Sequence, residues 1–318
     1  MEVMVMRHYL RPSDLGLPER RRGFVAGLAA VLLGLVPGLA LVACGSSPAK
    51  APGTAAVVSA PVRVAHTRLG PVGYRVVGSG PPLVLIMGYG WTIEDWDPRL
   101  VHALARHHRV VMFDNSGVGR TRQLPEPVTI DEMADQTSAL IEALGLGRPD
   151  VLGWSMGGMI AQALAVRHPA QVRRLVLCAT YPGTGQAVAP TAAARQAGSD
   201  FPANQGSALA AFKAAIAEYP SAPAVSASTK GDQGLAVSDW WVGHDAAGRE
   251  IARISAPTLI ADGADDQIAP VSNAHALARL IAGSRLVLYP DAGHGFLFQD
   301  WPRLAALVDS FLTGPAGH

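Results

Sequence analysis

The sequence predicts an α/β protein whose core is a mostly parallel, eight-stranded sheet with helices on both faces. From residue 61 onward, short apolar runs alternate with longer amphipathic ones, as strands and crossover helices do. The chain has 318 residues, 49% hydrophobic and 16% charged, so it can bury a sizeable core. One stretch, residues 182–254, interrupts the alternation and is expected to form a short helical cap.

The apolar and amphipathic segments set the expected bounds of each element. Strands are predicted at residues 62–67, 72–77, 82–87, 109–113, 150–153, 172–178, 257–261 and 285–289. Helices are predicted at residues 97–106, 130–144, 156–168, 271–281 and 302–312. Thr129 is expected to cap the second of these helices, because its hydroxyl can accept a backbone hydrogen bond ahead of the acidic first turn.

The cap insertion is rich in Ala, Ser and Gly. It holds helical patches at residues 187–197 and 208–219, followed by the adjacent pair Trp240 and Trp241. In open α/β sheets, ligands bind beyond the carboxyl ends of the strands. We therefore expect the insertion to lie over that edge.

The N-terminal segment has the layout of an export signal, with an arginine cluster, an apolar run over residues 24–43, and then small and polar residues. The letters LVAC at residues 41–44 resemble the lipobox of bacterial lipoproteins, which implies that Cys44 is lipidated after cleavage. We expect an export signal over residues 1–43, a flexible tether over residues 44–60, and a folded domain over residues 61–314. An uncleaved anchor or an ordinary signal is the alternative, and each places the domain outside the cytoplasm.

Charge and cysteine content exclude several classes of function. Beyond the N-terminal arginines the chain carries 21 basic and 22 acidic residues, without the basic patch that a nucleic-acid partner would need. Cys44 and Cys178 are the two cysteines, so the folded domain has no internal disulfide, and Cys178 ends an apolar run as a buried strand residue would. No His and Cys cluster has zinc spacing, so no metal or cofactor is expected.

The stretch DVLGWSMGGMIAQALA, residues 150–165, places Ser155 between Gly153 and Gly157 where a strand pattern gives way to a helix pattern. This is typical of a nucleophile elbow, a strained turn that exposes a serine hydroxyl. A serine nucleophile needs a base, and the base needs a group that orients it. Later strands supply candidates in the order Asp then His: TLIADGADDQIAP holds three aspartates, and LYPDAGHGFLFQ holds His294.

The chain from about residue 72 to residue 312 resembles the α/β-hydrolase superfamily, in particular its small esterases, lipases and haloperoxidase-like perhydrolases. The segments that carry the resemblance are YRVVGSGPPLVLIMGYG, VVMFDNSGVGRT, VLGWSMGGMIAQALAVRHP, PTLIADGADDQIAP and AGHGF. The resemblance implies the α/β-hydrolase fold, with Ser155 as nucleophile, His294 as general base and Asp266 as the acid. Asp265 is the alternative acid.

The resemblance also implies an oxyanion hole made by the backbone N–H groups of Met156 and Tyr89. The chain departs from the family pattern nearby, because Met87 precedes Gly88 where many relatives have His, and Ser116 stands where relatives often have Arg. Backbone donors do not depend on those side chains, so the hole itself is expected to survive. The departures put in question the hydrogen bonds that support the loop that carries Tyr89.

The protein is expected to be a membrane-anchored serine hydrolase that cleaves small-molecule carboxylic esters. Perhydrolase, lactonase and thioesterase activities are alternatives within serine chemistry. A catalytically inactive, ligand-binding surface lipoprotein is the alternative of another class. Six aromatic residues are candidates to wall an apolar acyl pocket, or else to attach the insertion to the sheet: Trp91, Trp154, Phe201, Phe212, Trp240 and Trp241.

Overall fold

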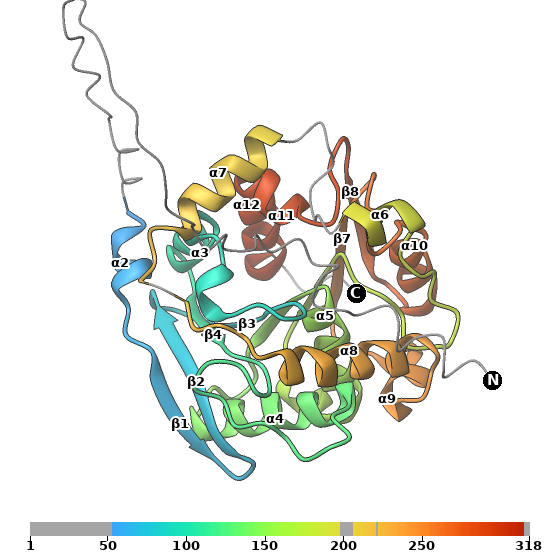
Figure 1. The fold of residues 1–318 in the computed structure, drawn as a ribbon, viewed down its shortest axis with the longest axis horizontal. Helices are drawn as coiled ribbons and strands as arrows, with labels where there is room; N and C mark the ends of the chain where they lie inside the picture. Colours follow the sequence, from blue (N-terminus) through green and yellow to red (C-terminus); the bar gives the residue numbers. More distant parts are fainter. Residues whose placement is uncertain (1–52, 198–205, 221, 315–318) are drawn as a thin grey trace, which may run out of the picture.

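The computed structural model describes residues 53–197, 206–220 and 222–314. Its centre is an eight-stranded sheet with the order β1-β2-β4-β3-β5-β6-β7-β8 (Figure 1). The strands are β1 (Arg63–Thr67), β2 (Gly70–Val77), β3 (Pro82–Ile86), β4 (Arg109–Phe113), β5 (Asp150–Trp154), β6 (Leu175–Cys178), β7 (Thr258–Gly263) and β8 (Arg285–Tyr289). The predicted mostly parallel, eight-stranded sheet is confirmed.

Strands β3 to β8 pair in parallel, whereas β1 and β2 form an antiparallel hairpin that joins the sheet along β4. Every residue of β5 and of β7 is buried, as expected for parallel strands covered on both faces. The carboxyl ends of β5, β6 and β7 therefore lie side by side at one edge of the sheet. The loops that leave this edge hold the residues singled out from the sequence.

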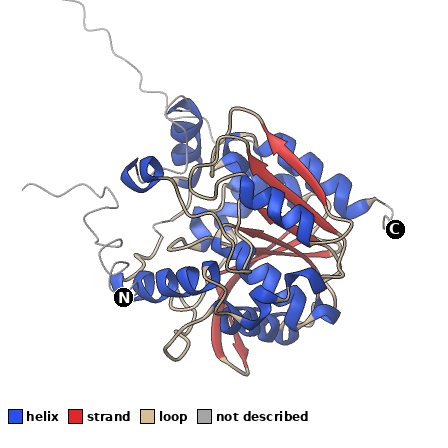
Figure 2. Ribbon diagram, turned by 90° about the vertical axis from the view of Figure 1, so that its right-hand side faces the viewer, coloured by secondary structure: helices blue, strands red, loops and turns tan. Residues whose placement is uncertain are grey.

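Helices cover both faces of the sheet, and Figure 2 shows the strands between them. Val84 and Ile86 of β3 point into one apolar core, whereas Leu83 and Leu85 point into the other. Helices on the first face are α4 (Ile130–Ala143), α5 (Met156–Arg167) and α10 (Ser272–Leu280). Helices on the second are α3 (Pro98–Ala105), α11 (Phe296–Gln299) and α12 (Trp301–Thr313).

Helix α4 begins as expected at Thr129. The Thr129 hydroxyl accepts a hydrogen bond from the N–H of Glu132 at 3.1 Å, and the Glu132 carboxylate accepts one from the N–H of Thr129 at 3.1 Å. This reciprocal pair is a capping box, which satisfies two N–H groups that the helix itself leaves without acceptors.

The insertion forms α6 (Ala192–Ala197), α7 (Gly206–Ile216), α8 (Ala227–Trp241), α9 (Ala246–Arg249) and the 3₁₀ turn η5 (Ile251–Arg253). The predicted patch at residues 187–197 starts later, because Thr191 caps α6 by accepting a hydrogen bond from the N–H of Ala194. The patch at residues 208–219 ends at Ile216, ahead of Pro220, since the residue before a proline disfavours helical backbone. Helix α8 was not predicted, because its apolar residues follow no clear helical period.

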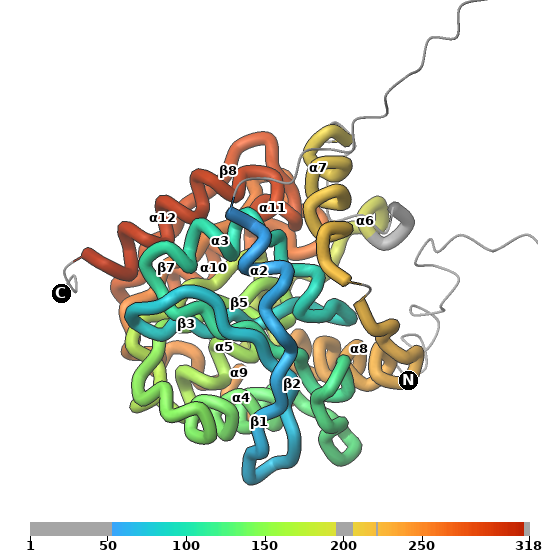
Figure 3. Tube along the Cα trace, turned by 90° about the vertical axis from the view of Figure 1, so that its left-hand side faces the viewer, coloured from blue at the N-terminus to red at the C-terminus, as the bar shows by residue number. Residues whose placement is uncertain are grey.

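The end of the predicted tether is corrected by the structure. Residues 55–59 form a short helix, α2 (Ala55–Ser59), labelled in Figure 3. Val57 of this helix is fully buried. The carbonyl of Val58 accepts a hydrogen bond from Arg75 at 3.0 Å, and the hydroxyl of Thr54 donates one to Glu218 at 3.0 Å. The sequence missed this because the partners of α2 lie on distant segments.

The expected export signal and residues 44–52 of the tether, including Cys44, lie outside the described residues. Within the described ranges, no helix combines the length and apolar character needed to cross a bilayer.

Candidate active site

Ser155 occupies the turn between β5 and α5 with φ +56° and ψ −123°, a backbone conformation that residues other than glycine rarely adopt. Its N–H donates to the carbonyl of Cys178 at 2.9 Å. Its carbonyl accepts from the hydroxyl of Thr180 at 2.7 Å and from the N–H of Gly158 at 2.9 Å. These contacts with β6 and α5 hold the strained backbone and keep the hydroxyl at the end of β5.

The glycines beside Ser155 are required by close backbone contacts. A Cβ at Gly153 would lie 2.2 Å from the carbonyl oxygen of Gly157, and a Cβ at Gly157 would lie 2.0 Å from that of Ile86. Both distances are far below van der Waals contact. Only glycine therefore lets α5 begin this close to β3 and β5.

The structure brings Ser155, His294 and Asp266 together, although they lie on three separate loops. The Nε2 atom of His294 is 2.9 Å from the Oγ of Ser155, and its Nδ1 atom is 2.8 Å from an Oδ of Asp266. The second Oδ of Asp266 accepts hydrogen bonds from the N–H groups of Ile268 and Ala269, at 2.8 Å each. This arrangement can orient the imidazole and let it accept the serine proton.

The alternative acid, Asp265, lies elsewhere. Its side chain is exposed, whereas His294 is 3% exposed and Asp266 is 5% exposed. Trp154 also holds the histidine loop, because its indole N–H donates to the carbonyl of His294 at 3.0 Å. The histidine is thus held through both its backbone and its ring.

The loop that carries Tyr89 passes directly beside the serine. A Cβ at Gly88 would lie 3.3 Å from the Cβ of Ser155. Within the described part of the chain, neither the N–H of Tyr89 nor that of Met156 has a protein acceptor. Both donors are therefore available to a group bound at Ser155.

Hydrogen bonds hold the chain at Met87 and at Ser116, the two positions where the sequence departs from the pattern of the family that it resembles. The carbonyl of Met87 accepts from the side-chain amide of Asn115 at 2.8 Å, which anchors the start of the Tyr89 loop. The hydroxyl of Ser116 accepts from the N–H of Leu124 at 2.9 Å. Asn115 was not among the predicted site residues, because its partner is a backbone atom that no motif marks.

Asp262 is a buried carboxyl that the sequence grouped with Asp265 and Asp266 without giving it a role. It is fully buried at the end of β7, where one oxygen accepts from the N–H of Gly263 at 2.8 Å. Burial, together with the neighbouring charge of Asp266, raises its pKa well above the ordinary value for Asp. Burial and the adjacent carboxyl of Asp266 therefore disfavour ionisation of Asp262.

Trp91 and Trp154 lie in an aromatic cluster next to the histidine. The ring centroids of Trp91 and Trp154 are 4.9 Å apart, and Trp91 stacks on Phe212 of α7 at 5.8 Å and on Phe298 of α11 at 6.0 Å. The ring of Trp154 also lies 5.3 Å from that of His294. The cap thus contributes Phe212 to this cluster, in which Trp154, Phe212 and Phe298 are buried and Trp91 is partly exposed.

Trp240 lies between α8 and the body of the protein, which corrects its assignment to a substrate pocket. Its ring is fully buried, and its N–H donates to the carbonyl of Tyr181 at 3.1 Å. The ring of Trp241 packs against that of Tyr181 at 4.8 Å. The pair therefore attaches α8 to the body of the protein, which was the alternative considered from the sequence. Phe201 lies outside the described residues.

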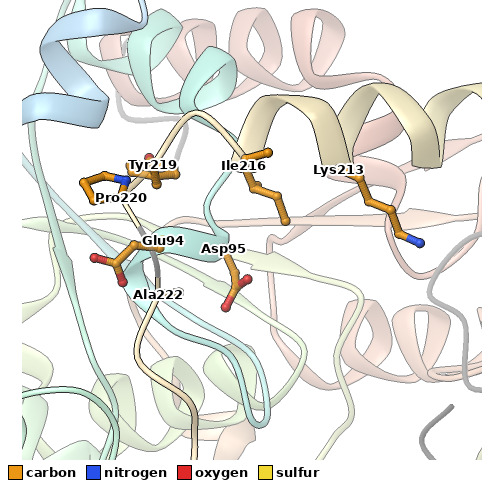
Figure 4. A pocket seen from close by; sticks show the side chains of 8 residues that line it. Glu94, Asp95, Lys213, Ile216, Tyr219, Pro220 and Ala222 are labelled. Carbon is orange, nitrogen blue, oxygen red and sulfur yellow. The ribbon is translucent and has the colours of Figure 1, made fainter. Parts of the chain in front are cut away.

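A cavity of about 420 Å³ opens between the 3₁₀ turn η2 (Ile93–Asp95) and the end of α7 (Figure 4). Glu94 in its wall is paired with Arg75 at 2.7 Å, and burial raises the pKa of Asp95. The lining does not include Ser155 or His294. It consists of Glu94, Asp95, Lys213, Ile216, Ala217, Tyr219, Pro220 and Ala222.

Cys178 is a buried strand residue, as expected from the sequence. Burial raises the pKa of its thiol far above the ordinary range, so it does not form the thiolate that a nucleophile needs. Across the described segments, no cluster of three or more His, Cys, Asp or Glu side chains is placed to hold a metal ion.

Comparison with known proteins identifies the family. Residues 81–300, more than half of the chain, match the sequence model of the alpha/beta hydrolase fold. The chain belongs to this family.

Three relatives illustrate the range of the family. A putative carbamate hydrolase of Caulobacter sp. is 29% identical over 76% of this chain and 96% of its own length. A non-heme chloroperoxidase of Streptomyces lividans is 29% identical over 70% of this chain and 89% of its own. The solved structure of an alpha/beta hydrolase fold protein from Chitinophaga pinensis has a TM-score of 0.72 at 25% identity, covering 81% of this chain and 98% of that one.

Replacing Asp262 by Asn is expected to reduce the loss of stability at rising pH. The native carboxyl keeps its proton above about pH 4, where an unfolded Asp loses it, so the native state binds more protons. The unfolding free energy of the wild type therefore falls as the pH rises, and Asp262→Asn lacks this contribution. Denaturant unfolding at a series of pH values measures the difference. Parallel stability curves for the two proteins would show that native Asp262 is charged.

Proposed function

We propose that the protein is a serine hydrolase that cleaves carboxylic esters through an acyl-enzyme, with Ser155, His294 and Asp266 as its catalytic triad. The observation that carries the proposal is the continuous chain of hydrogen bonds from Asp266 through His294 to the Ser155 hydroxyl. Family membership supports it, because relatives in this family are hydrolytic enzymes.

The contacts suggest one role for each residue. Ser155 Oγ attacks the ester carbonyl while His294 Nε2 takes the hydroxyl proton, and the histidine then returns that proton to the leaving alcohol. Asp266 holds Nδ1–H and stabilises the imidazolium that forms. Water, activated by the same histidine, attacks the acyl-enzyme and releases the acid together with free Ser155.

The N–H groups of Met156 and Tyr89 are the proposed oxyanion donors. Met156 N–H begins α5, where the aligned peptide dipoles favour negative charge. Each donor in such a hole contributes about 100- to 1,000-fold to turnover. The absence of a protein acceptor for these two groups in the described ranges supports this role.

The aromatic cluster supports an apolar acyl group as the preferred substrate feature. Trp91 is partly exposed and lies against Trp154, Phe212 and Phe298. Such a wall would contact an alkyl or aryl acyl chain better than a charged one. A panel of p-nitrophenyl esters of graded acyl length tests this, and turnover of the acetate alone would contradict it.

A perhydrolase is the second candidate function, and the chloroperoxidase name of one relative favours it. In that reaction hydrogen peroxide replaces water as the attacker of the same acyl-enzyme, which yields a peracid. Measuring peracid formation beside ester, lactone and thioester hydrolysis separates these chemistries. A protein that only binds ligands would turn over none of them.

A fluorophosphonate probe is expected to label the wild type at Ser155. The probe requires a serine hydroxyl activated by a neighbouring base, so Ser155→Ala should lose all labelling. Ser272→Ala, which changes an exposed serine on α10, is the matched control and should label normally. A wild type that does not react, or a Ser155→Ala variant that still does, would remove the basis for the proposal.

Asp266→Asn is expected to lower kcat by about 10⁴-fold, by analogy with triads in which the orienting Asp is replaced. The asparagine amide would favour the wrong imidazole tautomer. Asp265→Asn, which changes the adjacent exposed carboxylate, is the matched control and should keep kcat within about threefold of the wild type. The reverse result would assign the acid to Asp265.

We also propose that the protein is exported and held at the membrane by a lipid on Cys44. Metabolic labelling with a fatty-acid analogue is expected to mark the wild type and to disappear in Cys44→Ser. Cys178→Ser is the control, because this buried thiol is not available for acylation. Lipid labelling that persists in Cys44→Ser would refute the lipoprotein assignment.

A further inference from the structure

The side chain of Gln233 connects the cap to the loop that carries Tyr89. Gln233 lies on α8 and is only 1% exposed. Its carbonyl oxygen accepts a hydrogen bond from the N–H of Gly90 at 2.9 Å, and its amide donates one to the carbonyl of Ser116 at 3.1 Å. Both polar ends of the side chain are therefore satisfied, which fixes its orientation.

The contact acts on the peptide that follows Tyr89. Gly90 has φ +70°, a left-handed conformation that turns the chain directly after Tyr89. On the other side of Tyr89, Asn115 holds the carbonyl of Met87 at 2.8 Å. The backbone is thus held by a hydrogen bond on each side of Tyr89, one from Asn115 and one to Gln233. The Gln233 amide also donates to the carbonyl of Ser116, the residue next to Asn115.

The other hydrogen bonds at this end of α8 go elsewhere. Asp232 accepts from Gln123 at 3.0 Å, and the hydroxyl of Thr229 donates to the carbonyl of Gly117 at 3.3 Å. These bonds join α8 to the segment after β4. Among the described residues, one hydrogen bond joins the insertion to residues 88–92, and it is the bond between Gly90 and Gln233. The bond through Gln233 can therefore be removed while α8 keeps its other attachments.

We propose that Gln233 is a positioning residue that holds the Tyr89 N–H in the oxyanion hole from the cap. The inference rests on the proposed serine hydrolase function. Gln233 supports the loop with a buried side-chain amide that comes from the insertion. It also makes the placement of α8 a condition for stabilising the tetrahedral intermediate, since the same helix docks on the body through Trp240.

The test compares Gln233→Ala with the matched control Gln123→Ala, which removes a different bond between α8 and the body. Gln233→Ala is expected to lower kcat about 10- to 100-fold, while KM changes little. This loss is smaller than that caused by removing an oxyanion donor, because the Tyr89 N–H is displaced but still present. A trifluoromethyl ketone inhibitor should weaken by a similar factor, because its adduct with Ser155 carries the oxyanion. Gln123→Ala should keep kcat and inhibitor binding near the wild-type values.

Gln233→Glu provides the rescue experiment. A protonated glutamate is nearly isosteric with glutamine: it accepts from Gly90 and its O–H can donate to Ser116. The ionised form lacks that donor and repels the Ser116 carbonyl. The ratio of kcat in Gln233→Glu to kcat in the wild type should therefore rise as the pH falls, a signature that a loss of general stability would not give.

The outcomes separate this inference from the proposed function. If the wild type hydrolyses esters but a folded Gln233→Ala keeps kcat within about twofold, the positioning role is refuted and the hydrolase assignment stands. Equal losses in Gln233→Ala and Gln123→Ala would show that docking of α8 matters rather than this bond. Should Gln233→Ala fail to fold, the pH-dependent ratio of Gln233→Glu decides alone. A wild type inert to esters and to the fluorophosphonate refutes both proposals.

Discussion

The strained backbone of Ser155 is the constraint on which the rest of the site depends. The turn from β5 into α5 is possible because Gly153 and Gly157 allow backbone contacts that a Cβ would block. Hydrogen bonds from β6 then hold the unusual φ and ψ of the serine. Strain of this kind persists only where the surroundings over-determine it. The core of the parallel sheet supplies that rigidity, so the hydroxyl and the N–H of Met156 have fixed places.

Around this turn, burial controls where charge resides. His294 and Asp266 are almost completely buried, and the Asp266 carboxylate receives two backbone N–H groups in addition to the imidazole. Asp262 lies next to it, and both its burial and the neighbouring Asp266 raise its pKa, because two adjacent buried carboxylates would repel each other. In the proposed reaction, the hydrogen-bonded Asp266 would hold the imidazole and stabilise the imidazolium that forms.

The cap contributes through two kinds of contact. Trp240 and Trp241 contact Tyr181 and attach α8 to the body, while Phe212 of α7 stacks on Trp91 in the aromatic cluster. Polar contacts from Gln233 reach the backbone of the Tyr89 loop. The insertion thus contacts both the body of the protein and the loop that carries Tyr89.

The sequence by itself determined the strands, the elbow at Ser155, and the order of a serine, a loop with three aspartates and His294, because these depend on local patterns: apolar runs, glycine spacing and loop position after a strand. The choice of Asp266 among the three aspartates came from the resemblance to the α/β-hydrolase superfamily. Only the tertiary structure decided that Trp240 attaches the cap, that residues 55–59 pack as α2, and that Asn115 and Gln233 hold the Tyr89 loop. Each of these depends on a partner many residues away. Such pairings leave no local period, since a buried amide or indole is selected by the surface it meets once the chain has folded.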